Sequence, residues 1–421
     1  MGGTEPPVYR PFALLAFGAA LGAGAPLGIW MLAWLHLGAP APSPGWWLLH
    51  AHVQIFGFFA TLIAGVAQHL LPRFTGRPVV ASPIGRALAV ALGAALALRV
   101  VATWASAPGG LLVAALVQAA AFGAFAGWVW RALDPPPLAL LRHHLTASAG
   151  WLVLACAVEA GLRWRALALG LPLPDLGGMR AVHAMGIFGG VIGWVLGVIL
   201  RAGPMFVPSW RVPSRLAGAM PWLLLLGVAL IALGEAGRWS PRMAAVLPRA
   251  GELVALATVG AVMVTGGAFR IVRGALPMVA RSLEEVRIFR LAAAFAALAL
   301  VGTAAAAVAA ASGVAVHAAA DALRHLVTAG FLVSVVVAMA FRLIPVLERR
   351  TLPWPGLRTL AFWALLAGVL LRTAEVLTGH GWPGIGPWVV VSGALVWVAL
   401  AAVGLNLIGA IVSSPRGGGA E

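Results

Sequence analysis

Four histidines near the start of three apolar segments are the residues in this sequence best suited to chemistry. His50 and His52 begin "HAHVQIFGFFATLIAGVAQHLLPRF", His183 lies in "RAVHAMGIFGGVIGWVLGVILRAGPMF" and His325 lies in "DALRHLVTAGFLVSVVVAMAFRLIPVL". Each segment has small residues through its middle, and an Arg and a Pro close it 20 or 21 residues after His52, His183 or His325. A single histidine at a helix end is usually an interfacial or hydrogen-bonded residue. Three in register favour ligation of a metal or a haem iron.

The geometry of a helix separates the first two histidines. His50 and His52 are two positions apart, which turns their side chains about 200° away from each other. Both therefore cannot ligate one metal from a regular helix. His52 matches the repeated pattern and is the preferred iron ligand, whereas His50 is its partner or the ligand of a second site.

The composition indicates the class of protein that must hold these histidines. Of 421 residues, 62% are hydrophobic and only 10% are charged, which is typical of a membrane protein with many spans. The net charge of +16 comes from arginines scattered between apolar runs, so no nucleic-acid-binding motif is indicated. The single cysteine, Cys156, excludes a disulfide framework, a zinc ribbon and a CxxC redox pair.

Twelve stretches are long enough to cross a bilayer, which takes about 20 apolar residues. They are expected at 13–38, 46–71, 84–104, 109–131, 140–162, 181–203, 217–236, 246–270, 288–312, 320–344, 357–378 and 386–412.

The histidine-bearing segments recur every fourth span, with His52, His183 and His325 separated by 131 and 142 residues. The prediction is an all-α polytopic protein, with about twelve transmembrane helices in a pseudo-threefold bundle of four-helix repeats. Residues 1–421 form one integral membrane domain. Its approximate repeats are 13–162, 181–312 and 320–412, offset around the histidine-bearing helices 46–71, 181–203 and 320–344.

Arginines set the expected orientation. They are much denser on the loops that follow even-numbered spans, so the positive-inside rule places both termini in the cytoplasm. The abundance of Ala, Gly, Pro and Arg is typical of a chain from a GC-rich bacterial genome, so we expect a multi-pass protein of the inner membrane. Most of the histidines, including His50, His52, His183 and His325, then lie at or near the outer surface, and ionisable residues at membrane depth usually mark a site.

Histidines on segments 2 and 10 could hold a b-type haem between them, and the absence of CxxCH excludes covalent attachment. Haem propionates are anionic and would seek arginines on the outer side. Arg99 and Arg372 stand at equivalent positions of the repeat, and Arg324 adjoins His325. The alternative is that these arginines pair with neighbouring acids such as Glu375 or extend to the interface.

The plan of twelve segments with histidines on segments 2, 6 and 10 resembles subunit I of the haem–copper oxidases. The "HAH" opening with "FGF" and "IAG", and the later "RHLVTAG", are similar to the NnrS family of bacterial haem- and copper-containing membrane proteins. That family usually has Glu-Met after His-Ala-His, where this chain has Val53 and Gln54. The resemblance implies haem binding, with copper as a further cofactor, and a role in nitric oxide and nitrosative stress. The residues that match its motifs are His50, His52 and His325, with His183 in the middle repeat.

The sequence departs from a true oxidase. Segment 7 has no histidine, segment 10 has no His-x-His, no lysine is present, and the only tyrosine is Tyr9, placed in an N-terminal tail. Copper held by three imidazoles is therefore not expected. A metal site assembled from His183 with His317, Glu235 or His36 stays open.

Three functions compete. The first is a haem protein that binds or detoxifies nitric oxide or its metal–nitrosyl products. The second is an oxidase-like subunit that reduces nitric oxide or O2 with electrons from quinol or cytochrome c. The third is a transporter without cofactor, which threefold symmetry and polar groups confined to the outer half disfavour. Catalytic turnover and the electron donor are open at this point.

Overall fold

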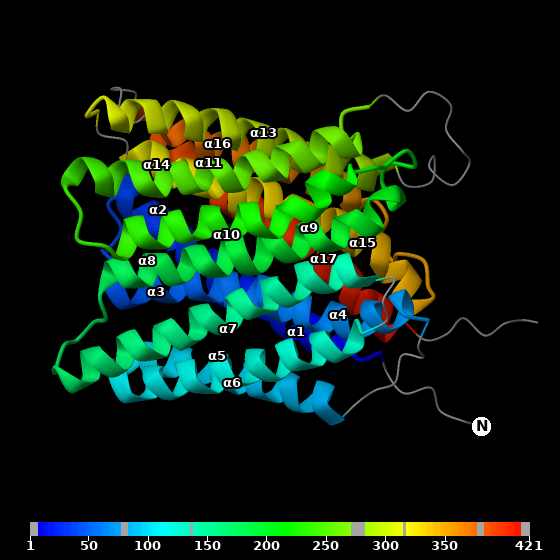
Figure 1. Cartoon of the computed structure of the whole chain (residues 1–421), viewed down its shortest axis with the longest axis horizontal. Coiled ribbons are helices and arrows are strands. Elements are labelled where there is room, and N and C mark those ends of the chain that lie inside the picture. Colours follow the sequence, from blue (N-terminus) through cyan, green and yellow to red (C-terminus); the bar gives the residue numbers. More distant parts are fainter. Residues whose placement is uncertain are drawn as a thin grey trace, which may run out of the picture.

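The chain folds into helices that run side by side in one bundle (Figure 1). This computed structural model describes residues 7–76, 83–134, 138–270, 283–314, 317–376 and 383–413. Within those ranges there is no strand, and 12 helical stretches are long and apolar enough to cross a membrane. Helices form there because the bilayer core offers the backbone no water, so its polar groups must pair within the segment. The predicted all-α fold with about twelve spans is confirmed.

Most spans contain one α-helix, and the first contains two. The single helices are α5 (Pro83–Trp104), α6 (Pro108–Ala132), α7 (Ala139–Ala168), α10 (Ser214–Ala236), α11 (Pro241–Gly266), α13 (Leu283–Ala311), α16 (Leu357–Thr373) and α17 (Gly386–Val412). The first span joins α1 (Tyr9–Ala19) to α2 (Ala25–Leu37) through a π-helical segment, Ala20–Gly24. It begins earlier than predicted, so the placement of Tyr9 in a tail is wrong: Tyr9 opens α1 and is buried.

The three histidine-bearing spans are each divided by a π-helical segment. Val53–Ala60 begins directly after His52, Leu326–Leu332 begins directly after His325, and Met185–Ile192 begins two residues after His183. Short π-helical turns inside α-helices are rare and are frequent at functional sites. The repeat seen in the sequence is thus also a repeat of backbone form. The flanking helices are α3 (Pro44–His52) with α4 (Thr61–Phe74), α8 (Leu176–Ala184) with α9 (Gly193–Ala202), and α14 (His317–His325) with α15 (Val333–Glu348).

The three histidine-bearing spans, which we call the divided spans although the first span also has a π-helical segment, form the interior of the bundle. Buried residues make up 72%, 78% and 67% of their most apolar stretches, against 33–56% in the other spans. Between successive divided spans the chain passes through three outer spans, α5–α7 and then α10, α11 and α13. The third arc consists of α16, α17 and the first span. It closes where α17 packs against α2, and Trp397 Nε1 donates to the Leu21 carbonyl at 3.0 Å.

The two ends of the bundle differ in character. Helices α3, α8 and α14 lie at one end, on the left in Figure 1, and α4, α9 and α15 lie at the other. We call the first the histidine end, because the four candidate histidines lie there or at its border with the π-helical segments. The arginine distribution predicts that this end faces the outer side of the membrane.

Candidate functional site

Two clusters of charged side chains at the histidine end include candidate histidines, whereas the Arg180–Glu235 and Arg249–Glu252 pairs there do not. The Glu159 cluster joins spans 2, 3, 4 and 5, and the Arg372 cluster joins spans 1, 10 and 11. The members of the Glu159 cluster are His52, Arg99, Gln118, Glu159 and Arg163. The members of the Arg372 cluster are His36, Asp321, His325, Arg372 and Glu375.

Glu159, on α7, is fully buried and is the centre of the first cluster. Its Oε1 accepts from Arg99 at 2.5 Å, and its Oε2 accepts from the same guanidinium at 3.1 Å. Arg163, one turn along α7, donates Nε–H to Oε1 at 2.7 Å. A bidentate Arg–carboxylate pair is among the strongest charge-assisted contacts in proteins. Two buried cations thus depend on one carboxylate.

His52 is built into this cluster. Its Nε2 donates to the Gln118 amide oxygen at 2.7 Å, an orientation that agrees with the Arg99 guanidinium 3.4 Å from the same oxygen. Its Nδ1 lies 3.4 Å from Glu159 Oε2 without forming a hydrogen bond. The ring also stacks on Phe56, with centroids 4.6 Å apart. If His52 ligated an iron or a metal ion through Nε2, it would therefore lose its hydrogen bond to Gln118.

The Arg372 cluster has the opposite distribution of charge. One guanidinium, Arg372, donates to both Glu375 and Asp321, and Glu375 also contacts His36 Nε2 at 2.9 Å. His325 donates Nδ1–H to the Asp321 carbonyl at 2.9 Å, one turn earlier on α14. Its Nε2 forms no hydrogen bond with the described part of the chain. His325 is therefore oriented by its backbone bond and has a free nitrogen.

His50 repeats this arrangement on α3. Its Nδ1 donates to the Gly24 carbonyl at 2.8 Å, and its Nε2 forms no hydrogen bond with a described residue. Gly28 makes room for the ring, because a Cβ there would come within 2.8 Å of His50 Cε1. The close approach of α2 and α3 thus depends on a glycine at position 28.

His183 completes the set from the third divided span. Its Nε2 is buried and has no hydrogen-bond partner among the described residues. His50, His183 and His325 thus come from three different spans and all lie at the histidine end of the bundle. In the described ranges, however, no three His, Cys, Asp or Glu side chains come together closely enough to hold one metal ion.

The predicted arginines have acidic or backbone partners in this structure. Arg99 pairs with Glu159, and Arg372 pairs with Asp321 and Glu375, as in the alternative that the sequence left open. Each keeps a buried Nε–H without a hydrogen-bond partner among the described residues. Arg324 donates to the Ala320 carbonyl of its own helix at 3.3 Å. A role for these three arginines toward propionates stays a prediction.

Sequence reasoning missed Gln118 and Asp321. Both had a signal that could have been used, since an amide or carboxylate in a membrane span is rare and usually has a partner. Gln118 is almost fully buried in α6, and Asp321 lies four residues before His325. The side chain of His317 and all of His380 lie outside what the structure describes.

Comparison with known proteins agrees with the residue pattern. A protein family described as NnrS protein matches residues 8–416 of the 421-residue chain. No curated protein matches the sequence.

Proposed function

Because the chain belongs to the NnrS family, a family of membrane proteins of the nitric oxide response, we propose that it binds haem at the histidine end and uses it to bind nitric oxide. The observation that carries this proposal is that His50, His183 and His325 each bring an imidazole to the same end of the three most buried spans. Ionisable groups inside a bilayer are costly and usually functional, and π-helical turns follow each of these histidines.

The state of the ring nitrogens supports an iron ligand at His50 and at His325. A ligating histidine almost always donates its other ring N–H to a carbonyl or carboxylate, which fixes the tautomer and the ring plane. Both residues already donate Nδ1–H to a backbone carbonyl and leave Nε2 free. His183 has a buried free Nε2 as well. These three residues fit a haem better than His52, whose selection as the preferred ligand stays a prediction.

The residues around these histidines would serve different tasks. Haem, when bound, supplies an iron with a position for a diatomic gas. His50 on α3 and His325 on α14 would hold it, one of them giving up its place on the iron when the gas binds, while His183 would offer a hydrogen bond beside it. The Glu159 and Arg372 clusters fix the surrounding helices, and the free Nε–H groups of Arg99 and Arg372 suit propionates.

Absorption spectroscopy of the purified full chain tests the proposal. We expect a Soret band that shifts on addition of nitric oxide, and its loss in His325→Ala and His50→Ala. His143→Ala is the matched control, since His143 is exposed at the opposite end of the bundle. A colourless protein without iron would overturn the proposal. Loss of haem in His52→Ala alone would return the ligand to His52.

A further inference from the structure

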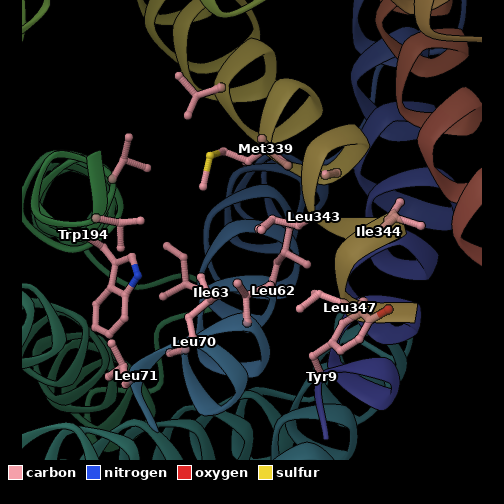
Figure 2. Close-up of a pocket in the computed structure, with 18 of the residues that line it drawn as sticks. Tyr9, Leu62, Ile63, Leu70, Leu71, Trp194, Met339, Leu343, Ile344 and Leu347 are labelled. Carbon is pink, nitrogen blue, oxygen red and sulfur yellow. The ribbon is translucent and has the colours of Figure 1, made fainter. Parts of the chain in front are cut away.

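The three divided spans differ in polarity between their two ends. At the end opposite the histidines, α4, α9 and α15 line an apolar pocket together with α1, and none of its lining residues is charged (Figure 2). Toward the histidine end, their π-helical segments carry two polar side chains, Gln54 in Val53–Ala60 and Thr328 in Leu326–Leu332. Thr328 donates its hydroxyl to the Arg324 carbonyl at 2.9 Å. Gln54 makes no hydrogen bond within the described ranges, so its amide has donors to offer.

The side chain of Gln54 contacts the same residue of the first span as His50, which lies four positions earlier. A Cβ on Gly24 would come within 2.9 Å of Gln54 Cδ and Nε2 and within 3.2 Å of its Oε1, so the amide lies flat against that glycine. The Gly24 carbonyl accepts the His50 Nδ1–H at 2.8 Å, and the ring lies against Gly28. Two small residues at this spacing let membrane helices approach closely. The Gln54 amide and the His50 imidazole therefore lie side by side against the first span.

The exposure of Gln54 differs from that of its neighbours. Val53 and Ile55 are buried, whereas Gln54 is half-buried, so part of its side chain is left uncovered by the surrounding helices. An amide in an apolar environment is costly unless it forms a hydrogen bond. A diatomic gas bound to a haem iron is a suitable partner, because its outer oxygen accepts hydrogen bonds and such donors govern which gas a haem retains.

We propose that Gln54 donates its Nε2–H to nitric oxide held on the haem, and that His50 is the histidine that gives up its place on the iron. This role of Gln54 rests on the proposed function of the histidine end. A departing histidine leaves room for the gas on its own side of the haem, and Gln54 follows His50 by one turn on the same span. His325 stays as the ligand on the other side, where Thr328 has its hydroxyl engaged with its own helix.

Infrared spectroscopy of the reduced full chain with bound carbon monoxide tests this role, together with the dissociation rate of nitric oxide. A hydrogen bond to the gas lowers the C–O stretching frequency. We therefore expect Gln54→Leu, which removes the donor, to raise this frequency and to speed nitric oxide dissociation about fivefold, the effect of one hydrogen bond. Thr328→Val is the matched control and should change neither, because the lost bond is internal to its helix. His183 is present in both variants, so its own contribution cancels in the comparison.

The other outcomes separate this role from the proposed function. If Gln54→Leu binds haem with an unchanged C–O frequency, the role of Gln54 is wrong and the proposed function stands. A frequency that responds only to Thr328→Val would place the gas on the His325 side and also overturn the proposal. A wild type without haem would overturn both. The Tm of the gas-free protein should not fall in Gln54→Leu, since an unbonded amide is replaced by an apolar group; a fall would show that the amide supports the fold instead.

Discussion

The two clusters at the histidine end use similar residues in opposite proportions. In the Glu159 cluster two arginines share one carboxylate, and in the Arg372 cluster two carboxylates share one arginine. His52 has its Nε2 engaged with Gln118 in the first, whereas His325 keeps its Nε2 free in the second. Glu159 is fully buried, while the Asp321 side chain is 41% exposed.

This difference separates a supporting role from a binding role. A buried carboxylate that two arginines share fixes the surrounding helices, and the His52 Nε2 beside it is held by Gln118. A cluster with an excess acid and a histidine oriented by its backbone can accept a ligand without losing its own contacts. The equivalent positions of His52 and His325 therefore have different roles, support of the fold and binding of a ligand. Three variants test this difference.

Glu159→Gln should have the largest effect. The amide keeps the shape but removes the charge, which leaves Arg99 and Arg163 buried without a counterion. We expect a loss of about 4 kcal/mol in the free energy of unfolding, measured by denaturant titration in detergent micelles. Asp134→Asn is the control, since its ion pair with Arg142 has a 71% exposed carboxylate and should change stability by less than about 1 kcal/mol. Equal effects from the two variants would contradict the central role of Glu159.

Gly28→Ala should have the second largest effect, through His50. The added Cβ would come within 2.8 Å of the imidazole and displace it from the Gly24 carbonyl. We expect about 2 kcal/mol of destabilisation, typical of overpacking, together with an altered Soret band. Gly18→Ala, in α1 of the same span, meets nothing within 4 Å and is the matched control. An unchanged spectrum in Gly28→Ala would argue against His50 as a ligand.

Asp321→Asn should have the smallest effect of the three. Arg372 keeps Glu375, and the His325 bond is to the backbone of Asp321, which the change leaves intact. We expect about 1 kcal/mol of destabilisation and retention of haem, measured by the same titration and by absorbance. A loss as large as that of Glu159→Gln would show that the two clusters are equally essential to the fold.

Much of the fold could be predicted from the sequence, because the bilayer restricts the choice to helices of known length. The repeat around His52, His183 and His325 was also visible, since a polar residue stands out in an apolar run. The ends were less certain, and the start of the first span at Tyr9 was missed because "YRPF" carries an arginine, which Glu348 of a distant span neutralises.

The state of each histidine could not be predicted from spacing. Whether an imidazole is free depends on side chains that other spans bring to it, such as Gln118 on α6 for His52. The apolar pocket gave no sequence signal either, because its Leu, Ile and Val residues have the same composition as any buried helix face.

The closure between α17 and α2 has a consequence for biosynthesis. Helices enter the membrane in chain order. The first span therefore packs against α17, its neighbour in the bundle, only after the last span has been made. The hydrogen bond of Trp397 in α17 with the Leu21 carbonyl joins residues separated by 376 positions. In a nascent chain interrupted before α17, the face of α2 that α17 would cover stays exposed. We therefore expect such truncated chains to be targets of membrane quality control, even though they contain all of the candidate histidines.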